Sequence, residues 1–300
     1  MMVGAKGRVS MKGIYIAALI TTIAVLLIFG TLAYKIKDKA NERWLLLAFL
    51  IALPLQPLAF YFVRLPLNRL LVMILGSKST LYEWITLFYA PLTEEPAKLV
   101  PLLVPFILRD INKETFVRYA VVIGLGFGIG EIWFVASRVA QNPQFASMPF
   151  YNFGGFFSER MMVCVIHGVF LSVSLWRLRD RFWFGVLGAM GLHFLGNFPI
   201  YLMTKNFLGL GQPFWQVLVS LWVVLFFIGG LALLAAFKYG SAKKIGRFIF
   251  GKAKCPECGK VYDKPLFGLN LGPKRYEPCP HCKKWHLVGI ENSVTEEQTD

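Results

Sequence analysis

The chain has 300 residues, of which 56% are hydrophobic and only 16% are charged. Soluble domains carry about a quarter charged residues, so this composition excludes an ordinary soluble domain, and its hydrophobicity excludes a disordered chain. The formal net charge of +15 does not by itself indicate nucleic-acid binding, because membrane proteins place such an excess in cytoplasmic loops that contact lipid head groups.

Seven apolar segments are long enough to cross a bilayer, which takes about 20 mostly apolar residues in a helix. The third is unusually long and contains four prolines, and we expect Pro91 and Pro96 to kink it because each removes a backbone donor. The expected fold is an all-α polytopic membrane domain over residues 1–237. Its seven predicted spans are residues 14–34, 44–63, 81–108, 117–140, 160–176, 182–203 and 213–237.

The first span begins after basic residues, a feature that it shares with signal peptides. Its apolar stretch exceeds the ~7–15 residues of a signal core, and no small-x-small cleavage site follows it. We therefore expect it to be retained as a membrane anchor.

Lysine and arginine are distributed unequally between the two sides of the predicted membrane domain. Sixteen of them lie on the side that includes the segment after the seventh span, and nine lie on the other side. The richer side is expected to be cytoplasmic, which places the amino terminus outside and the carboxyl tail in the cytoplasm.

Several ionisable or strongly polar side chains lie inside the predicted spans. An Asp, Lys or Arg at a helix centre costs ~2.5–3.5 kcal/mol, so such residues persist when they are paired, hydrated or functional. Their depth in the membrane follows from a rise of ~1.5 Å per residue across a ~30 Å slab. The estimated depths share one slice of the bilayer, from the midplane to the outer half, which indicates one shared site. They are Glu94, Glu95 and Lys98 in the third span, Glu131 in the fourth, His167 in the fifth, and His193 and Asn197 in the sixth.

Helical spacing predicts which of these side chains face the same way. Residues four apart share a helix face, so His193 lies beside Asn197 and Glu94 beside Lys98, whereas Glu95 points about 100° away from Glu94. A structural ion pair between Glu94 and Lys98 is therefore the alternative to a functional role for that glutamate.

Glycine alternates through the fourth span just before Glu131. This spacing creates two small-xxx-small pairs, which allow a neighbouring helix to approach closely. The pairs are Gly124 with Gly128 and Gly126 with Gly130.

Carboxylates and imidazoles at this depth permit hydrolysis of a bond inside the membrane. A buried carboxylate can act as a general base toward water, and imidazole or carboxamide donors can stabilise an oxyanion. Alternatively, His167, His193 and Glu131 can hold a catalytic zinc ion with one open position. The same residues would suit a proton- or ion-coupled transporter, although no inverted repeat is visible, or an inactive membrane scaffold.

These motifs, in this order along the chain, resemble the PrsW family of intramembrane proteases, which belongs with the wider CAAX-protease and bacteriocin-processing group. The resemblance covers roughly residues 81–203. It rests on Glu94-Glu95-Pro96-Ala97-Lys98, Gly126-Phe127-Gly128-Ile129-Gly130-Glu131, the isolated His167 and His193-x-x-x-Asn197.

The resemblance implies an endopeptidase that cuts a membrane protein, an anti-sigma factor or another single-span protein, on its extracytoplasmic side. A metal-bound and a bare-glutamate mechanism both fit the sequence. By position, Glu94 and Glu95 would supply the water-activating carboxylate, Glu131, His167 and His193 would complete the site, Asn197 would polarise the scissile carbonyl, and Lys98 would support them.

Two positions depart from the wider group. That group has Arg five residues after its first Glu, whereas here Lys98 stands four residues after Glu94. It also has Phe four residues before the histidine of its second motif, whereas Val163 stands four residues before His167. Both departures favour the PrsW branch.

The segment after the last span contains two Cys-x-x-Cys pairs separated by 20 residues, Cys255 with Cys258 and Cys279 with Cys282. This spacing predicts a β-rich zinc ribbon over residues 251–290 with a structural zinc ion, because each pair supplies two thiolates to a tetrahedral site. Two disulfides would require an oxidising compartment, and the tail is predicted to be cytoplasmic.

Two further segments flank the predicted ribbon. We expect a basic juxtamembrane linker over residues 238–250 and a disordered tail over residues 291–300. The ribbon is expected to dock to a cytoplasmic protein. The alternatives are nucleic acid, bound through the nearby basic residues but without strong evidence, and a purely structural role.

Overall fold

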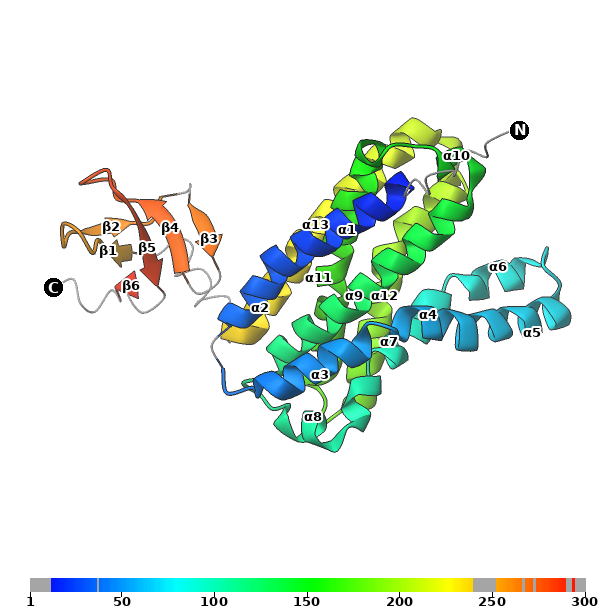
Figure 1. Ribbon diagram of the computed structural model, residues 1–300, viewed down its shortest axis with the longest axis horizontal. Coiled ribbons are helices and arrows are strands. Elements are labelled where there is room, and N and C mark those ends of the chain that lie inside the picture. Colours follow the sequence, from blue (N-terminus) through cyan, green and yellow to red (C-terminus); the bar gives the residue numbers. More distant parts are fainter. Residues whose placement is uncertain are drawn as a thin grey trace, which may run out of the picture.

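The computed structural model consists of a helical membrane domain and a small β module, which follow one another along the chain (Figure 1). Six helical segments in the described part of the chain are long and apolar enough to cross a membrane, which confirms the polytopic α-helical prediction. They are Gly13–Tyr34, Leu55–Leu75, Phe116–Gln141, Phe150–Trp176, Phe182–Thr204 and Gln212–Tyr239. The structure describes residues 12–36, 38–239, 252–265, 268–271, 274–289 and 293–294.

The long helices run roughly side by side in one bundle (Figure 1). The first segment is α1 (Gly13–Val25), which continues through a π-helical turn (Leu26–Gly30) into α2 (Thr31–Lys35). The helices of the second half are α9 (Phe116–Gln141), the short α10 (Pro143–Ala146), α11 (Gly154–Trp176) after a 3-10 turn (Phe150–Phe153), α12 (Phe182–Thr204) and, after a 3-10 turn (Phe207–Gly209), α13 (Gln212–Tyr239).

Between α2 and α9 the sequence predicted two continuous spans, residues 44–63 and 81–108. The structure instead has one helical segment of span length, Leu55–Leu75, flanked by short helices. Prolines explain much of this, since Pro101 and Pro105 lie in the first turns of new helices, where a missing N–H costs nothing. The elements are α3 (Glu42–Ala52), α4 (Leu55–Ala59), a π turn (Phe60–Arg64), α5 (Leu65–Leu75), α6 (Thr80–Thr86), α7 (Tyr89–Ala97), a 3-10 turn (Val100–Leu103) and α8 (Pro105–Asp110).

The hairpin of α5 and α6 extends away from the bundle, and α7 returns the chain to it (Figure 1). No residue of α5 or α6 is buried, whereas five residues of α7 are. The predicted third span therefore does not form one transmembrane helix, and its glutamates enter the bundle on the short helix α7.

Helix α9 lies at the centre of the bundle, and two of its glycines face α11. A Cβ atom on Gly124 would overlap the backbone of Gly168, and one on Gly128 would lie 2.7 Å from the Cα atom of Cys164. This contact between small residues brings the two helix backbones together.

The other two glycines of α9 face α3. A Cβ atom on Gly126 would lie 2.6 Å from the carbonyl oxygen of Phe49, and one on Gly130 would overlap the carbonyl oxygen of Leu53. The alternating glycines therefore serve two neighbouring helices, one on each side of α9, where the sequence predicted one.

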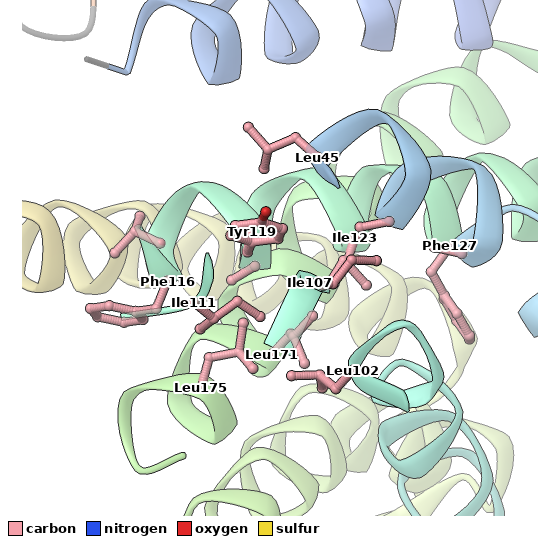
Figure 2. Close-up of a cluster of buried hydrophobic side chains, with 14 of the residues drawn as sticks. Leu45, Leu102, Ile107, Ile111, Phe116, Tyr119, Ile123, Phe127, Leu171 and Leu175 are labelled. Atoms are coloured by element: carbon pink, nitrogen blue, oxygen red, sulfur yellow. The ribbon is translucent and has the colours of Figure 1, made fainter. Parts of the chain in front are cut away.

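Close packing of large apolar side chains joins α3, α8, α9 and α11 beside the α9–α11 contact (Figure 2). Phe127 lies at one end of this cluster and packs edge-on against the His167 ring, with centroids 4.9 Å apart. The core thus continues to the polar residues described below. Its labelled members are Leu45, Leu102, Ile107, Ile111, Phe116, Tyr119, Ile123, Phe127, Leu171 and Leu175.

The β module contains two three-stranded antiparallel sheets. Ser293 and Val294, which lie in the segment that the sequence predicted to be disordered, instead form β6 and pair with β1. Residues 240–250 of the predicted linker, residues 251 and 290 of the predicted ribbon, and residues 291–292 and 295–300 of the predicted tail lie outside the described residues. The sheets are β2-β1-β6 and β3-β4-β5, with β1 Lys252–Lys254, β2 Val261–Asp263, β3 Leu269–Leu271, β4 Lys274–Pro278, β5 Trp285–Gly289 and β6 Ser293–Val294.

Candidate functional site

Glu95 is the buried centre of a charged cluster at the end of α7. Its Oε1 atom accepts hydrogen bonds from Lys98 Nζ, over 2.6 Å, and from His193 Nδ1, over 2.5 Å. Glu95 is 1% exposed and Lys98 is fully buried. The alternative for Glu94, a structural ion pair with Lys98, is not formed: α7 ends at Ala97, and the lysine that follows it bonds the residue three positions back.

Glu94 instead pairs with an arginine from another part of the chain. Its Oε1 atom accepts from Arg64 Nη2 over 2.6 Å, and Arg64 also donates to the hydroxyl of Thr93. The other carboxylate oxygen, Oε2, lies 3.9 Å from His193 Nε2, which is too long for a hydrogen bond.

Glu131 of α9 forms the second charged cluster. Its Oε1 atom accepts from Arg160 Nη1 over 2.9 Å, and its Oε2 atom lies 2.7 Å from His167 Nε2. Arg160 also pairs with Glu159 on α11. The contact between Gly124 and the residue after His167 explains how α9 and α11 come close enough for this imidazole to reach the carboxylate.

The two clusters meet through the histidine rings. The rings of His167 and His193 lie edge to face with centroids 6.1 Å apart. Phe170 stacks on His193 at 4.9 Å, and the ammonium group of Lys98 lies 5.2 Å from the ring centroids of both Phe127 and Phe170. Aromatic faces thus stabilise the buried cation.

A cavity of about 240 Å³ opens between these clusters. Five of the six residues predicted to be catalytic line it, but Glu95 does not, because it lies behind His193. Apolar side chains of α11, α12 and α13 complete the wall. The polar lining consists of Arg64, Glu94, Glu131, Glu159, Arg160, His167, His193 and Asn197.

Three charged residues that line the cavity were not predicted from the sequence, because they lie near the ends of predicted spans, where charged residues are common. They are Arg64, Glu159 and Arg160. Arg160 could have been found, because it lies seven residues before His167 and two helical turns place both on one face of α11. No local pattern indicates Arg64, whose position depends on how the π turn packs against α7.

The donor types around the cavity suit a divalent metal ion. Two imidazoles and two carboxylates converge there, which are ligand types that zinc binds in catalytic sites. The buried Nδ1 atom of His167 has no hydrogen-bond partner among the described residues, because the ring directs its other nitrogen, Nε2, to Glu131. The residue types thus match a catalytic metal site, whereas the group of ligand atoms that the described structure gathers in one place is that of the cysteines below.

The four paired cysteines form a second and separate cluster. Their sulfur atoms all lie within 4.8 Å of one another. Cys255 Sγ lies 3.7 Å from Cys282 Sγ, and Cys258 Sγ lies 3.9 Å from Cys279 Sγ. All four are free thiols rather than disulfides, and this arrangement fits one tetrahedral metal ion.

Each pair of cysteines sits in the same kind of turn. Cys255 N–H donates to the Lys260 carbonyl, and Cys279 N–H donates to the Lys284 carbonyl, both over 2.9 Å. Desolvation opposes ionisation, but the backbone N–H groups of Cys282 and His281 lower the pKa of the Cys279 thiol to about 7. A thiolate is the form that binds metal.

Residues 40–229 match the family model described as PrsW family intramembrane metalloprotease. No curated protein and no solved structure matches the chain.

Proposed function

The chain belongs to the PrsW family of intramembrane metalloproteases, and from this premise we propose that peptide bonds of membrane proteins are hydrolysed in the cavity between Glu94 and Glu131. The observation that carries the proposal is the convergence of both carboxylates with His167 and His193 around one cavity, from four different helices. The membrane domain that holds the cavity supplies the multi-pass context that an intramembrane peptidase requires.

Glu94 is the proposed general base. It lines the cavity, and its Oε2 atom is not the atom that Arg64 holds. A carboxylate in this position can take a proton from an attacking water molecule, which contributes about 10²–10⁴-fold to rate in general base catalysis.

His167, His193 and Glu131 are the proposed ligands of a catalytic zinc ion. A zinc ion so held would polarise the scissile carbonyl and lower the pKa of a bound water molecule. Asn197, one turn after His193 on α12, is proposed to donate its carboxamide N–H to the developing oxyanion.

Glu95 and Lys98 are proposed to position His193 rather than to contact substrate. The Nδ1–H group of His193 donates to Glu95, which leaves the lone pair of Nε2 directed toward Glu94 and the cavity. Such a partner fixes the tautomer and the ring orientation of a metal-binding histidine. Lys98 neutralises the buried carboxylate.

Arg64 and Arg160 are proposed to hold the two cavity carboxylates in place. Each arginine bonds one oxygen of a glutamate and leaves the other oxygen to face a histidine. Because a guanidinium group is planar and always charged, this contact also offsets the cost of two carboxylates within the membrane domain.

The substrate is proposed to be a single-span membrane protein, such as an anti-sigma factor, cut on its extracytoplasmic side. The family supports a membrane-protein substrate. The excess of lysine and arginine on the side of the carboxyl tail supports the orientation, with that tail in the cytoplasm and the amino terminus outside. The cysteine cluster is proposed to hold a structural zinc ion in the cytoplasm.

The test is a census of protein amino termini in membranes that contain either the wild-type chain or Glu94→Gln at equal abundance. We expect new termini in or beside transmembrane segments only with the wild type. Glu83→Gln is the matched control, because Glu83 is an exposed glutamate paired with Lys205 away from the cavity. Equal sets of termini with wild type and Glu94→Gln would contradict the proposal.

A further inference from the structure

One face of the sheet β3-β4-β5 is apolar and exposed in the described part of the chain. Side chains alternate along β4 and β5, so that Arg275, Glu277, His286 and Val288 are buried on one side of the sheet. On the other side, Leu269, Tyr276 and Leu287 form a row across the three strands through their register. We define the apolar face as Leu269, Leu271, Tyr276, Trp285 and Leu287, which are between 37% and 63% exposed.

Aromatic rings and lysines are combined on this face. The rings of Tyr276 and Trp285 pack together with centroids 5.3 Å apart. Lys274 lies opposite Leu271 on the same side of the sheet, and Lys283 and Lys284 precede Trp285 on the exposed turn. Tyrosine and tryptophan prefer the boundary between lipid and water, where one part of the ring is apolar and the other is hydrated.

The charge of this part of the chain is strongly positive. Residues 238–289 contain twelve Lys and Arg residues but only three Asp and Glu residues. Of these three, Glu277 is fully buried and Glu257 pairs with Lys284 over 3.0 Å. The last four carboxylates of the chain follow residue 290, outside the sheet that carries the apolar face.

The length of the connection keeps the module near the membrane. Twelve residues separate Tyr239, the end of α13, from Lys252, the start of β1. At a maximum of ~3.3–3.6 Å per residue, they reach at most roughly 45 Å from the end of a helix that is long and apolar enough to cross the bilayer. A surface held this close meets lipid at a high effective concentration.

We propose that the apolar face binds the surface of a bilayer rich in anionic phospholipid, with Trp285, Tyr276 and the leucines in the interfacial layer and the lysines against the lipid phosphates. This combination of aromatic rings, aliphatic side chains and basic charge is complementary to such a surface. The proposal does not depend on peptidase activity.

Photo-cross-linking of the full-length protein in nanodiscs tests this directly. A photoreactive phenylalanine analogue replaces Leu287 on the apolar face, and the same analogue replaces the exposed Lys260, in the turn between β1 and β2, as the control. In discs with one quarter phosphatidylglycerol, we expect at least about fivefold more lipid adduct from position 287 than from position 260. The adduct should fall about fivefold for Lys274→Gln, since each basic residue near an anionic surface contributes about that factor in binding.

Zinc content, measured on each variant, shows that the module remains folded. Adducts to lipid that are equal at the two positions would overturn the proposal. So would adducts at position 287 to protein alone in native membranes, because they would identify a protein partner as the occupant of the apolar face. With the photoreactive analogue at position 287, the yield of lipid adduct should be the same whether residue 94 is Glu or Gln. This result separates the membrane-binding proposal from the proposed catalytic role.

Discussion

The buried pair of Glu95 and Lys98 leads to a prediction that separates two adjacent glutamates. Both side chains are at most 1% exposed, and their charged atoms lie 2.6 Å apart. Removing one partner of a buried ion pair costs about 3–5 kcal/mol, because the remaining charge has no compensation. We expect Glu95→Gln to lower the free energy of unfolding by about that amount, since Lys98 has no access to water.

Glu94→Gln should have a much smaller effect on stability. Its partner Arg64 is partly exposed and lines the cavity, where water can solvate the guanidinium group. A glutamine oxygen can still accept from Arg64, so we expect a loss of about 1 kcal/mol together with the loss of cleavage. Glu94→Gln would thus be folded and inactive, whereas Glu95→Gln would be destabilised.

A double-mutant cycle isolates the ion pair from other effects. Lys98→Met alone should also cost about 3–5 kcal/mol. The double variant Glu95→Gln with Lys98→Met removes both charges, and replacement of a whole buried ion pair is often neutral, so we expect it to lie within about 2 kcal/mol of the wild type. The coupling free energy should then be at least about 3 kcal/mol.

Unfolding in mixed micelles of detergent and SDS, followed by tryptophan fluorescence, measures these free energies. Glu83→Gln, an exposed glutamate paired at the surface with Lys205, is the control and should change stability by less than about 1 kcal/mol. Costs that simply add in the double variant, or a Glu95→Gln protein as stable as the wild type, would refute the argument from buried charge.

Three further predictions concern packing, metal and the cavity. Gly128→Leu should destabilise the membrane domain by about 1–3 kcal/mol or more, because the new side chain meets the backbone at Cys164. Gly229→Leu on α13 is the control and should be tolerated, because a Cβ atom there meets no atom within 4 Å. Equal unfolding midpoints for the two variants would contradict the role of small residues. Cys258→Ser should lower the metal content of the protein, measured by mass spectrometry. Metal should also be lost from the wild type as the pH falls, because a cysteine thiol must lose its proton to bind metal. Retention of metal in acid would contradict ligation by thiolates. Arg160→Gln should reduce kcat more than it raises KM if the arginine positions Glu131, and an increase in KM alone would indicate that it binds substrate instead.

Much of the membrane domain could be predicted because burial in lipid imposes a simple pattern. A helix that crosses the bilayer needs an uninterrupted apolar stretch, and the first and the last four predicted spans lie within helices of the structure. The region of residues 44–108 was predicted less well, because its segment of span length is Leu55–Leu75 rather than 44–63 or 81–108, and the chain on either side of that segment forms short helices. Composition alone does not distinguish a helix that crosses the membrane from a broken segment that enters the bundle.

For the polar residues, the sequence by itself identified which side chains are costly in a membrane, and for the cysteines it identified the spacing that brings four thiols together. Both follow from local chemistry: the residue types, the helical repeat and the reach of a Cys-x-x-Cys turn. Only the tertiary structure decided the partners. Glu94 pairs with Arg64, thirty residues away, and Glu95 with His193, ninety-eight residues away. Such pairs depend on the crossing of helices at small residues and on the return of the chain to the bundle through α7. These contacts between distant segments leave no periodic signal in the sequence.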